Sequence, residues 1–170
     1  MTRVLYLLRH AKSSWEDPSL PDRERPLAPR GRRDSQRIAK HLARLEIDPE
    51  LVLCSDAVRT RETLELIRPA LGAAEVRLEE GLYAASSDEL LERIRLVPET
   101  VTSVMLIGHN PGMQALALLL VSRGAELERL EAKFPTAALA TLVFPKTTWN
   151  DIAPADATLA GYVVPKQLRS

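Results

Sequence analysis

Three apolar runs, each stopped by polar residues, are the clearest pattern along this chain. They cover residues 4–8, 51–54 and 101–107 and are rich in leucine and valine. Short continuous runs of this kind are typical of strands that are buried on both faces of a parallel sheet. A weaker run at 76–78 predicts one more short strand.

Segments with helical spacing lie between these runs. Apolar stripes predict one helix over 32–45 and a second over 57–71. A Ser-x-x-Glu capping box at Ser86 predicts the start of a third helix, which Pro98 ends. The almost wholly apolar segment 113–122 predicts a fourth, deeply buried helix. Because strands and helices alternate, we expect an α/β fold in which helices flank a mostly parallel sheet.

The C-terminal part of the chain has a different pattern. Residues 137–144 and 159–165 predict two further strands with no helical segment between them. Consecutive strands without a crossover helix are expected to pair antiparallel, although the linker between these two is long.

Residues 13–28 predict a long loop, because they are rich in proline and charge and show no period. We interpret this loop as a rim over the end of the first strand, and a plain connector explains it equally well. Trp15 argues for order, since a large aromatic side chain is expected to bury part of its surroundings.

Composition restricts the possible functions. The 170 residues fit one domain, 1–170, and 23 basic residues balance 23 acidic ones. A net charge of zero argues against a general nucleic-acid binder and against a polybasic membrane anchor. The single cysteine, Cys54, excludes an intramolecular disulfide and is expected to be a buried small hydrophobe. No signal peptide or membrane-spanning run is recognised, so we expect a cytoplasmic protein.

Polar side chains that suit phosphate follow the three core strands. Arg9 and His10 end the first strand, Arg59 follows the second, and His109 follows the third. The carboxyl ends of neighbouring parallel strands share one edge of a sheet, where ligands bind. A guanidinium matches the geometry of phosphate, and a histidine can act as a nucleophile near neutral pH. Arg59 and Arg61 also lie in the first turn of a predicted helix, where the helix dipole disfavours positive charge. An anion bound at that helix end would explain why two arginines stand there. The alternative is a set of strands that stop in solvated basic residues.

Other chemistries fit less well. The chain has three histidines, none at i, i+4 spacing, and no acidic residue stands beside His10 or His109 in the sequence, so a metal site is the weaker interpretation. The glycine-rich phosphate loops of nucleotide-binding folds are absent, and so is the Gly-x-Ser-x-Gly turn of serine hydrolases.

Three segments resemble motifs of the histidine phosphatase (phosphoglycerate mutase-like) superfamily. Residues 8–12 are similar to its Leu-Arg-His-Gly or Leu-Arg-His-Ala signature, 55–63 to its Ser-Pro-x-x-Arg-Ala-x-Gln-Thr segment, and 108–110 to its second histidine in the form Gly-His-Asn. The segments 25–27 and 30–31 fit the small SixA-type phosphohistidine phosphatase branch. The chain departs from the pattern at three positions of the second motif: Asp56, Thr60 and Glu62.

The resemblance implies a three-layer α/β sandwich of the phosphoglycerate mutase-like type and a catalytic set. In this set His10 takes the phosphoryl group and forms a transient phosphohistidine, while Arg9, Arg59 and His109 clamp the phosphoryl oxygens. No metal or other cofactor is expected, because the arginines supply the positive charge. Glu80 is the candidate general acid and Glu79 its rival, with a solvated surface role equally open for both. Further candidates for substrate binding are Lys12, Ser14 and Arg25.

The expected substrate is a phosphohistidine on a protein domain, because 170 residues leave no room for the insertions that close the pockets of larger members. One alternative is a phosphatase of the same superfamily for small phosphate esters. A second alternative, of another class, is a non-catalytic phosphate-binding module. The partner is thus expected to be a phosphorylated protein or a small ester, with no nucleic acid and no membrane, and the oligomeric state stays open.

Overall fold

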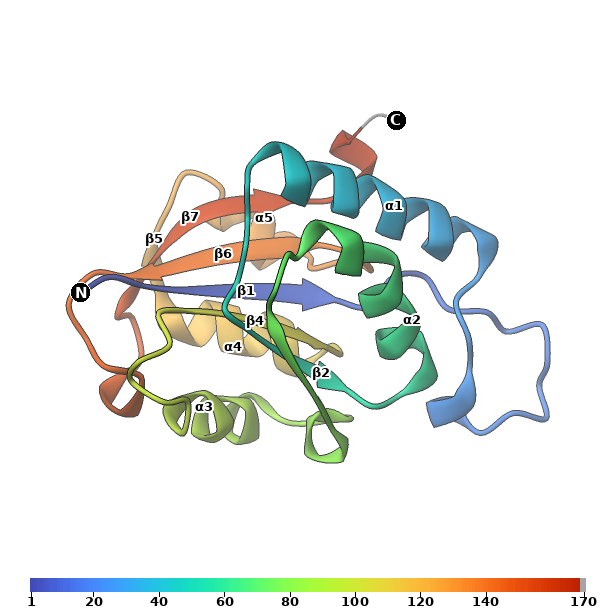
Figure 1. Ribbon diagram of the computed structural model, residues 1–170, viewed down its shortest axis with the longest axis horizontal. Coiled ribbons are helices and arrows are strands. Elements are labelled where there is room, and N and C mark those ends of the chain that lie inside the picture. Colours follow the sequence, from blue (N-terminus) through green and yellow to red (C-terminus); the bar gives the residue numbers. More distant parts are fainter. Residues whose placement is uncertain (169–170) are drawn as a thin grey trace.

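The fold is built on a seven-stranded sheet with the strand order β3-β2-β4-β1-β6-β7-β5, in a computed structural model that describes residues 1–168 (Figure 1). The strands are β1 (Arg3–Arg9), β2 (Leu51–Ser55), β3 (Glu75–Glu79), β4 (Ser103–Gly108), β5 (Val121–Arg123), β6 (Leu139–Phe144) and β7 (Ala157–Val163). The three predicted core strands and the short strand near residue 76 are confirmed.

The three core strands are neighbours in the sheet and run parallel. β4 pairs with β1 on one side and with β2 on the other, and both pairings are parallel. The register sets Arg9 opposite Gly108 and Cys54 opposite Ile107, so the polar residues that follow each strand leave the sheet at one edge. β6 is antiparallel to both β1 and β7, which confirms the predicted C-terminal hairpin.

Helices cover both faces of the sheet and make a three-layer sandwich, as expected. Figure 1 shows α1 and α2 on one side and α3 and α4 on the other. The helices are α1 (Pro29–Arg44), α2 (Val58–Ile67), α3 (Ser87–Arg95), α4 (Gly112–Leu120) and the short α5 (Leu127–Ala132).

Each core strand sends alternate side chains into two apolar clusters, one on each face. Leu53 and Leu106 pack with α3 and α4, whereas Cys54 and Ile107 pack with α1 and α2. Each fully buried leucine stabilises the fold by roughly 1.5–3 kcal/mol. Cys54 is inaccessible, which confirms its predicted place, and burial raises the pKa of its thiol to about 12.

Local signals explain where several helices begin. Pro29 occupies the first turn of α1, where a backbone N–H would have no hydrogen-bond partner within the helix, so the N–H that proline lacks is not needed. The capping box at Ser86 is confirmed: the Ser86 hydroxyl accepts from the Glu89 amide at 3.2 Å, and the Glu89 carboxylate accepts from the Ser86 amide at 2.9 Å. The segment predicted as one helix over 57–71 is interrupted, because α2 ends at Ile67 and a 3-10 turn containing Pro69 follows.

Three features differ from the sequence-based expectations. α4 is not buried all round, since Leu118 on its outer side is 37% exposed. Trp15 buries little of itself: it is 70% exposed and lies against the guanidinium of Arg25, at 3.1 Å from the ring centroid. β5 and α5 were not predicted.

Within residues 1–168, no helix combines the length and apolarity that a bilayer crossing requires.

Candidate active site

His10 lies just beyond the end of β1 with its ring held in one orientation. Its amide donates to the Gly108 carbonyl at 3.1 Å, and the ring is nearly inaccessible. Nδ1 lies 2.7 Å from the Ala11 carbonyl oxygen, which can only accept a hydrogen bond. Nδ1 therefore carries the proton, and the lone pair of the neutral ring is on Nε2. The Ala11 amide in turn donates to the Thr63 hydroxyl of α2 at 3.0 Å, which anchors this turn.

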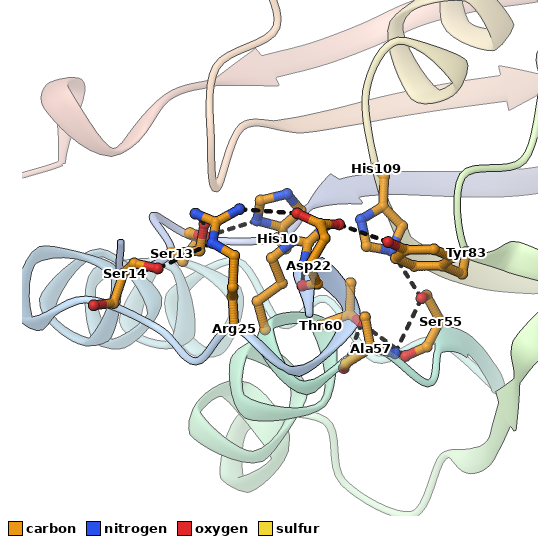
Figure 2. A network of polar contacts seen from close by, with 12 residues as sticks. His10, Ser13, Ser14, Asp22, Arg25, Ser55, Ala57, Thr60, Tyr83 and His109 are labelled. Carbon is orange, nitrogen blue, oxygen red and sulfur yellow. Dashed lines mark hydrogen bonds and ion pairs between the residues drawn. The ribbon is translucent and has the colours of Figure 1, made fainter. Parts of the chain in front are cut away.

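His109, just beyond β4, brings a second imidazole next to the first. The ring centroids of His10 and His109 are 5.3 Å apart, and Figure 2 shows the two rings on neighbouring segments. Nε2 of His109 lies 2.8 Å from the Ser55 hydroxyl, which already accepts from the Ala57 amide at 3.3 Å. The Ser55 hydroxyl can point its hydrogen at Nε2, and in that arrangement the proton of the neutral His109 ring is on Nδ1. Nδ1 is buried and has no partner among the described residues, so it is a donor available to a ligand oxygen.

Burial and neighbouring cations keep both imidazoles neutral. Burial lowers the pKa of His10 to about 3; the Ala11 hydrogen bond opposes this shift, and His109, Arg59 and Arg9 add to it. Burial also lowers the pKa of His109 to about 4, with Arg59 as the next cause. At neutral pH His10 is therefore an uncharged base with its lone pair on Nε2, as a nucleophile at phosphorus requires.

The two predicted arginines reach the same place from two elements. Arg9 donates to the Phe134 carbonyl at 3.1 Å, and its Nε is buried without a partner among the described residues. Arg59, in the first turn of α2, is 7% exposed. Burial and the charge of Arg59 lower the pKa of the Arg9 guanidinium. A guanidinium whose pKa is lowered by a neighbouring cation favours an anion bound beside it.

Asp22, which the sequence analysis missed, supplies the negative charge on the Arg59 side. It begins the 3-10 turn Asp22–Glu24 within the loop over 13–28, so this loop does form a rim of the site. Its carboxylate accepts from Arg59 at 2.9 Å. It also accepts from Arg25 at 3.0 Å and from the Tyr83 hydroxyl at 2.6 Å (Figure 2). The Tyr83 hydrogen bond, followed by those from Arg59 and Arg25, holds the pKa of Asp22 well below its usual range, so the group is ionised.

Tyr83 is the second residue that the sequence analysis missed. Its ring meets that of His109 edge-on at 5.3 Å between centroids, and the guanidinium of Arg23 lies over it at 4.8 Å. Tyr83 follows the 3-10 turn Glu80–Leu82 that comes directly after β3. It thus brings the β3 end of the sheet into the site.

Neither candidate for the general acid bonds to a side chain of this cluster through its carboxylate, among the described residues. Glu80 is exposed, and no hydrogen bond or ion pair of its carboxylate is present within residues 1–168. Glu79 is engaged elsewhere, because Arg93 of α3 holds its carboxylate at 2.7 and 2.9 Å. A role for either in proton transfer stays a prediction to which these contacts lend no support.

The predicted substrate-binding residues of the loop mainly hold the loop. Arg25 is buried and donates to the Ser13 hydroxyl at 2.7 Å and to the Ser14 carbonyl at 3.0 Å. Ser14 accepts from the Glu16 amide at 3.1 Å. The Lys12 carbonyl accepts from the Ala28 amide at 2.9 Å and fixes the start of α1. Substrate contacts by these three side chains stay predictions.

The assembled site offers a nucleophilic nitrogen surrounded by cationic and neutral donors. His10 supplies the lone pair, and Arg9, Arg59 and His109 supply N–H groups, a set that complements a tetrahedral oxyanion. Among the described residues, no three His, Cys, Asp or Glu side chains gather in a way that would ligate a metal ion.

Comparison with known proteins points to one family. A sequence model of the histidine phosphatase superfamily (branch 1) matches residues 5–89. An uncharacterized protein of Mycobacterium tuberculosis is 37% identical over 94% of this chain and 100% of its own length. The SixA protein of Agrobacterium tumefaciens is 32% identical, with a TM-score of 0.82 over 96% of this chain and 98% of that one. The SixA protein of Nakamurella multipartitia is 30% identical, with a TM-score of 0.81 over 96% of both chains. With its matched motifs lying around the His10 ring, the chain belongs to the histidine phosphatase superfamily and is of the SixA type.

Proposed function

We propose that this phosphatase removes the phosphoryl group from a phosphohistidine on a protein through a covalent intermediate on His10. One observation carries the proposal above all others. The 2.7 Å contact between Nδ1 of His10 and the Ala11 carbonyl leaves the lone pair on Nε2, in a ring that burial keeps neutral. This nitrogen is the nucleophile.

The first step transfers the phosphoryl group to the enzyme. Nε2 of His10 attacks phosphorus, a new N–P bond forms, and the bond to the leaving group breaks with its electron pair on the leaving atom. Arg9 and Arg59 neutralise the charge on the phosphoryl oxygens, and the free Nδ1–H of His109 donates to one of them. Removal of one such donor typically costs about 10²–10³ in rate.

The second step restores the enzyme. A water molecule attacks phosphorus, the N–P bond to His10 breaks with its electron pair on Nε2, and inorganic phosphate leaves with the oxygen of that water. His10 is then neutral again and keeps its Nδ1 proton on the Ala11 carbonyl.

The proton supply favours a phosphohistidine over a phosphate ester. An alkoxide leaving group needs a general acid, but within residues 1–168 neither the Glu80 nor the Glu79 carboxylate bonds to a side chain of the site, and Asp22 is ionised. An imidazole leaving group is a weak base that departs readily once its second nitrogen is protonated from solvent. The loop over 13–28 also does not cover the site fully, since the Asp22 side chain in it is 48% exposed. A phosphohistidine on a protein surface could therefore approach from this side. The SixA names of the two similar structures fit the same substrate class.

A side-by-side rate measurement tests the substrate class. The purified protein is assayed on a histidine-phosphorylated phosphotransfer domain, on free phosphohistidine and on a sugar phosphate. We expect kcat/KM to be highest on the phosphorylated domain and lowest on the sugar phosphate. A clear preference for the sugar phosphate would replace the proposed substrate with a small ester. Absence of turnover on every substrate would favour a non-catalytic phosphate-binding module.

A further inference from the structure

A pocket with an unusual concentration of positive charge lies beside the site. Its volume is about 550 Å³, and it is formed by α1, the segment after α5 and the C-terminal turn Pro165–Gln167, which Figure 1 shows next to α1. We call it the basic pocket. Among the described residues its charged side chains are five cations and one carboxylate: Arg30, Arg33, Arg37, Lys133, Lys166 and Asp34.

The positive charge of the basic pocket is largely uncompensated. The chain as a whole is neutral, so this excess is local. Asp34 is largely buried and its carboxylate is shared by Arg37 at 2.9 Å and Arg30 at 3.8 Å. Arg33, Lys133 and Lys166 are exposed, and within residues 1–168 none of them forms an ion pair. Exposed cations that have no carboxylate nearby attract anions from solution.

The basic pocket adjoins the catalytic site along residues 9–12. On one side, Lys133 and Pro135 flank Phe134, whose carbonyl accepts the hydrogen bond from Arg9 at 3.1 Å. On the other side, α1 presses against the main chain at Lys12: a Cβ atom on Gly31 would lie 2.1 Å from the Lys12 carbonyl oxygen. Segments that line the basic pocket therefore also touch the turn that carries His10.

We propose that the basic pocket docks an acidic surface of the phosphorylated protein and so presents its phosphohistidine to His10. This inference rests on the proposed function, because it names the chemistry of the partner for that same site. Small-molecule sites are mostly apolar, with a few well-placed polar groups. Long exposed arginine and lysine side chains instead resemble the charged rim of a protein interface, which steers association and selects partners.

Charge reversal in the pocket separates docking from chemistry. The variants are Arg33→Glu, Lys166→Glu and the double variant. The matched control is Arg123→Glu, because Arg123 is exposed on β5 at the far edge of the sheet and has no ion pair among the described residues. Each protein is assayed on a phosphorylated phosphotransfer domain with an acidic surface and on free phosphohistidine, at low and at high salt.

We expect the double variant to lose about tenfold or more in kcat/KM on the phosphorylated domain at low salt, and high salt to shrink this loss. Its rate on free phosphohistidine and the rates of Arg123→Glu should equal those of wild type. The inference is wrong if the double variant hydrolyses the domain at the wild-type rate, or if both substrates lose equally. It is also wrong if inorganic polyphosphate alters wild-type turnover of free phosphohistidine and the double variant abolishes that response, since the pocket would then take a small polyanion.

The proposed function has its own readout in this experiment. If wild type hydrolyses a sugar phosphate better than either phosphohistidine substrate, the proposed substrate fails, whatever the charge variants do. If wild type prefers the phosphorylated domain and the charge variants match it, the proposed function stands and only the docking site fails.

Discussion

Asp22 holds the guanidinium of Arg59 through two contacts, one from its carboxylate at 2.9 Å and one from its main-chain carbonyl at 2.6 Å. A residue of the loop over 13–28 thus positions the arginine that comes from α2. The N–H groups of Arg59 that Asp22 does not use remain available to a phosphoryl group. The loop and the helix therefore act together in the site.

Replacement of Asp22 by asparagine tests this positioning. Asp22→Asn keeps an oxygen acceptor but removes the charge that strengthens the contact with Arg59. We expect kcat/KM to fall by about 10–100-fold, because a small misplacement of a catalytic group has effects of this order. Asp17→Asn is the matched control, since Asp17 lies in the same loop and its carboxylate bonds only to Ser19 among the described residues. Equal activity of the two variants would show that Arg59 needs no such support.

Removal of Arg59 itself is expected to abolish most activity and keep the fold. Arg59→Ala takes away a donor to the transition state, and we expect kcat to fall by about 10²–10³ or more. Its neighbour Arg61 is exposed and serves as the control in Arg61→Ala. Chemical denaturation followed by circular dichroism checks the fold. Loss of cooperative unfolding in Arg59→Ala would assign the residue a structural role instead.

We expect the contact between Ser55 and His109 to select the tautomer of that histidine that carries its proton on Nδ1. Ser55→Ala removes the hydroxyl 2.8 Å from Nε2, so the proton is no longer directed to Nδ1. We expect about a tenfold or greater fall in kcat, a size typical of lost partners that orient a functional histidine. Nitrogen NMR of the imidazoles should show a changed proton distribution on His109. Ser55→Thr, which keeps a hydroxyl, should restore both, and wild-type NMR signals in Ser55→Ala would contradict the assignment.

The lowered pKa of His10 predicts a specific dependence of stability on pH. The pKa is about 3 in the folded state and about 6.5 in the unfolded state, so below pH 6.5 the unfolded chain binds more protons. The free energy of unfolding should therefore fall as the pH drops from about 6.5 toward 3. By pH 5, His10 alone should have lowered it by about 2 kcal/mol.

Denaturation of wild type and His10→Asn at pH 7 and pH 5 measures this contribution. The asparagine variant has no titrating group at this position, so it should lose less stability than wild type between the two pH values. Equal losses would mean that His10 titrates normally in the folded protein.

The residues that follow the core strands were predictable because the signal is local. Arg9, His10 and His109 each come directly after a buried apolar run, and parallel pairing brings such strand ends together. Arg59 was recognisable because a cation in the first turn of a helix needs an anion to explain it. The sequence alone therefore predicted six of the seven strands and the parallel core, and it placed Arg9, His10, Arg59 and His109 at one edge of the sheet.

Asp22 and Tyr83 were not predictable, because their contact joins positions 61 residues apart. Asp22 lies in a loop without periodicity, and Tyr83 follows a turn whose two glutamates are the more obvious candidates for acid chemistry. The candidate acid Glu80 illustrates the limit: its position after β3 was predicted, but which side chain of that turn would point inward depends on three-dimensional packing. β5 and α5 are too short to produce a periodic signal.

The covalent intermediate on His10 is tested most directly by locating the phosphoryl group on the enzyme during turnover. Wild type is mixed with a histidine-phosphorylated phosphotransfer domain, quenched at alkaline pH and analysed by peptide mass spectrometry. We expect one acid-labile phosphate on His10, with none in His10→Ala. A wild-type protein that turns over without a phosphate on His10, or a His10→Ala variant that still acquires the label, would contradict this expectation.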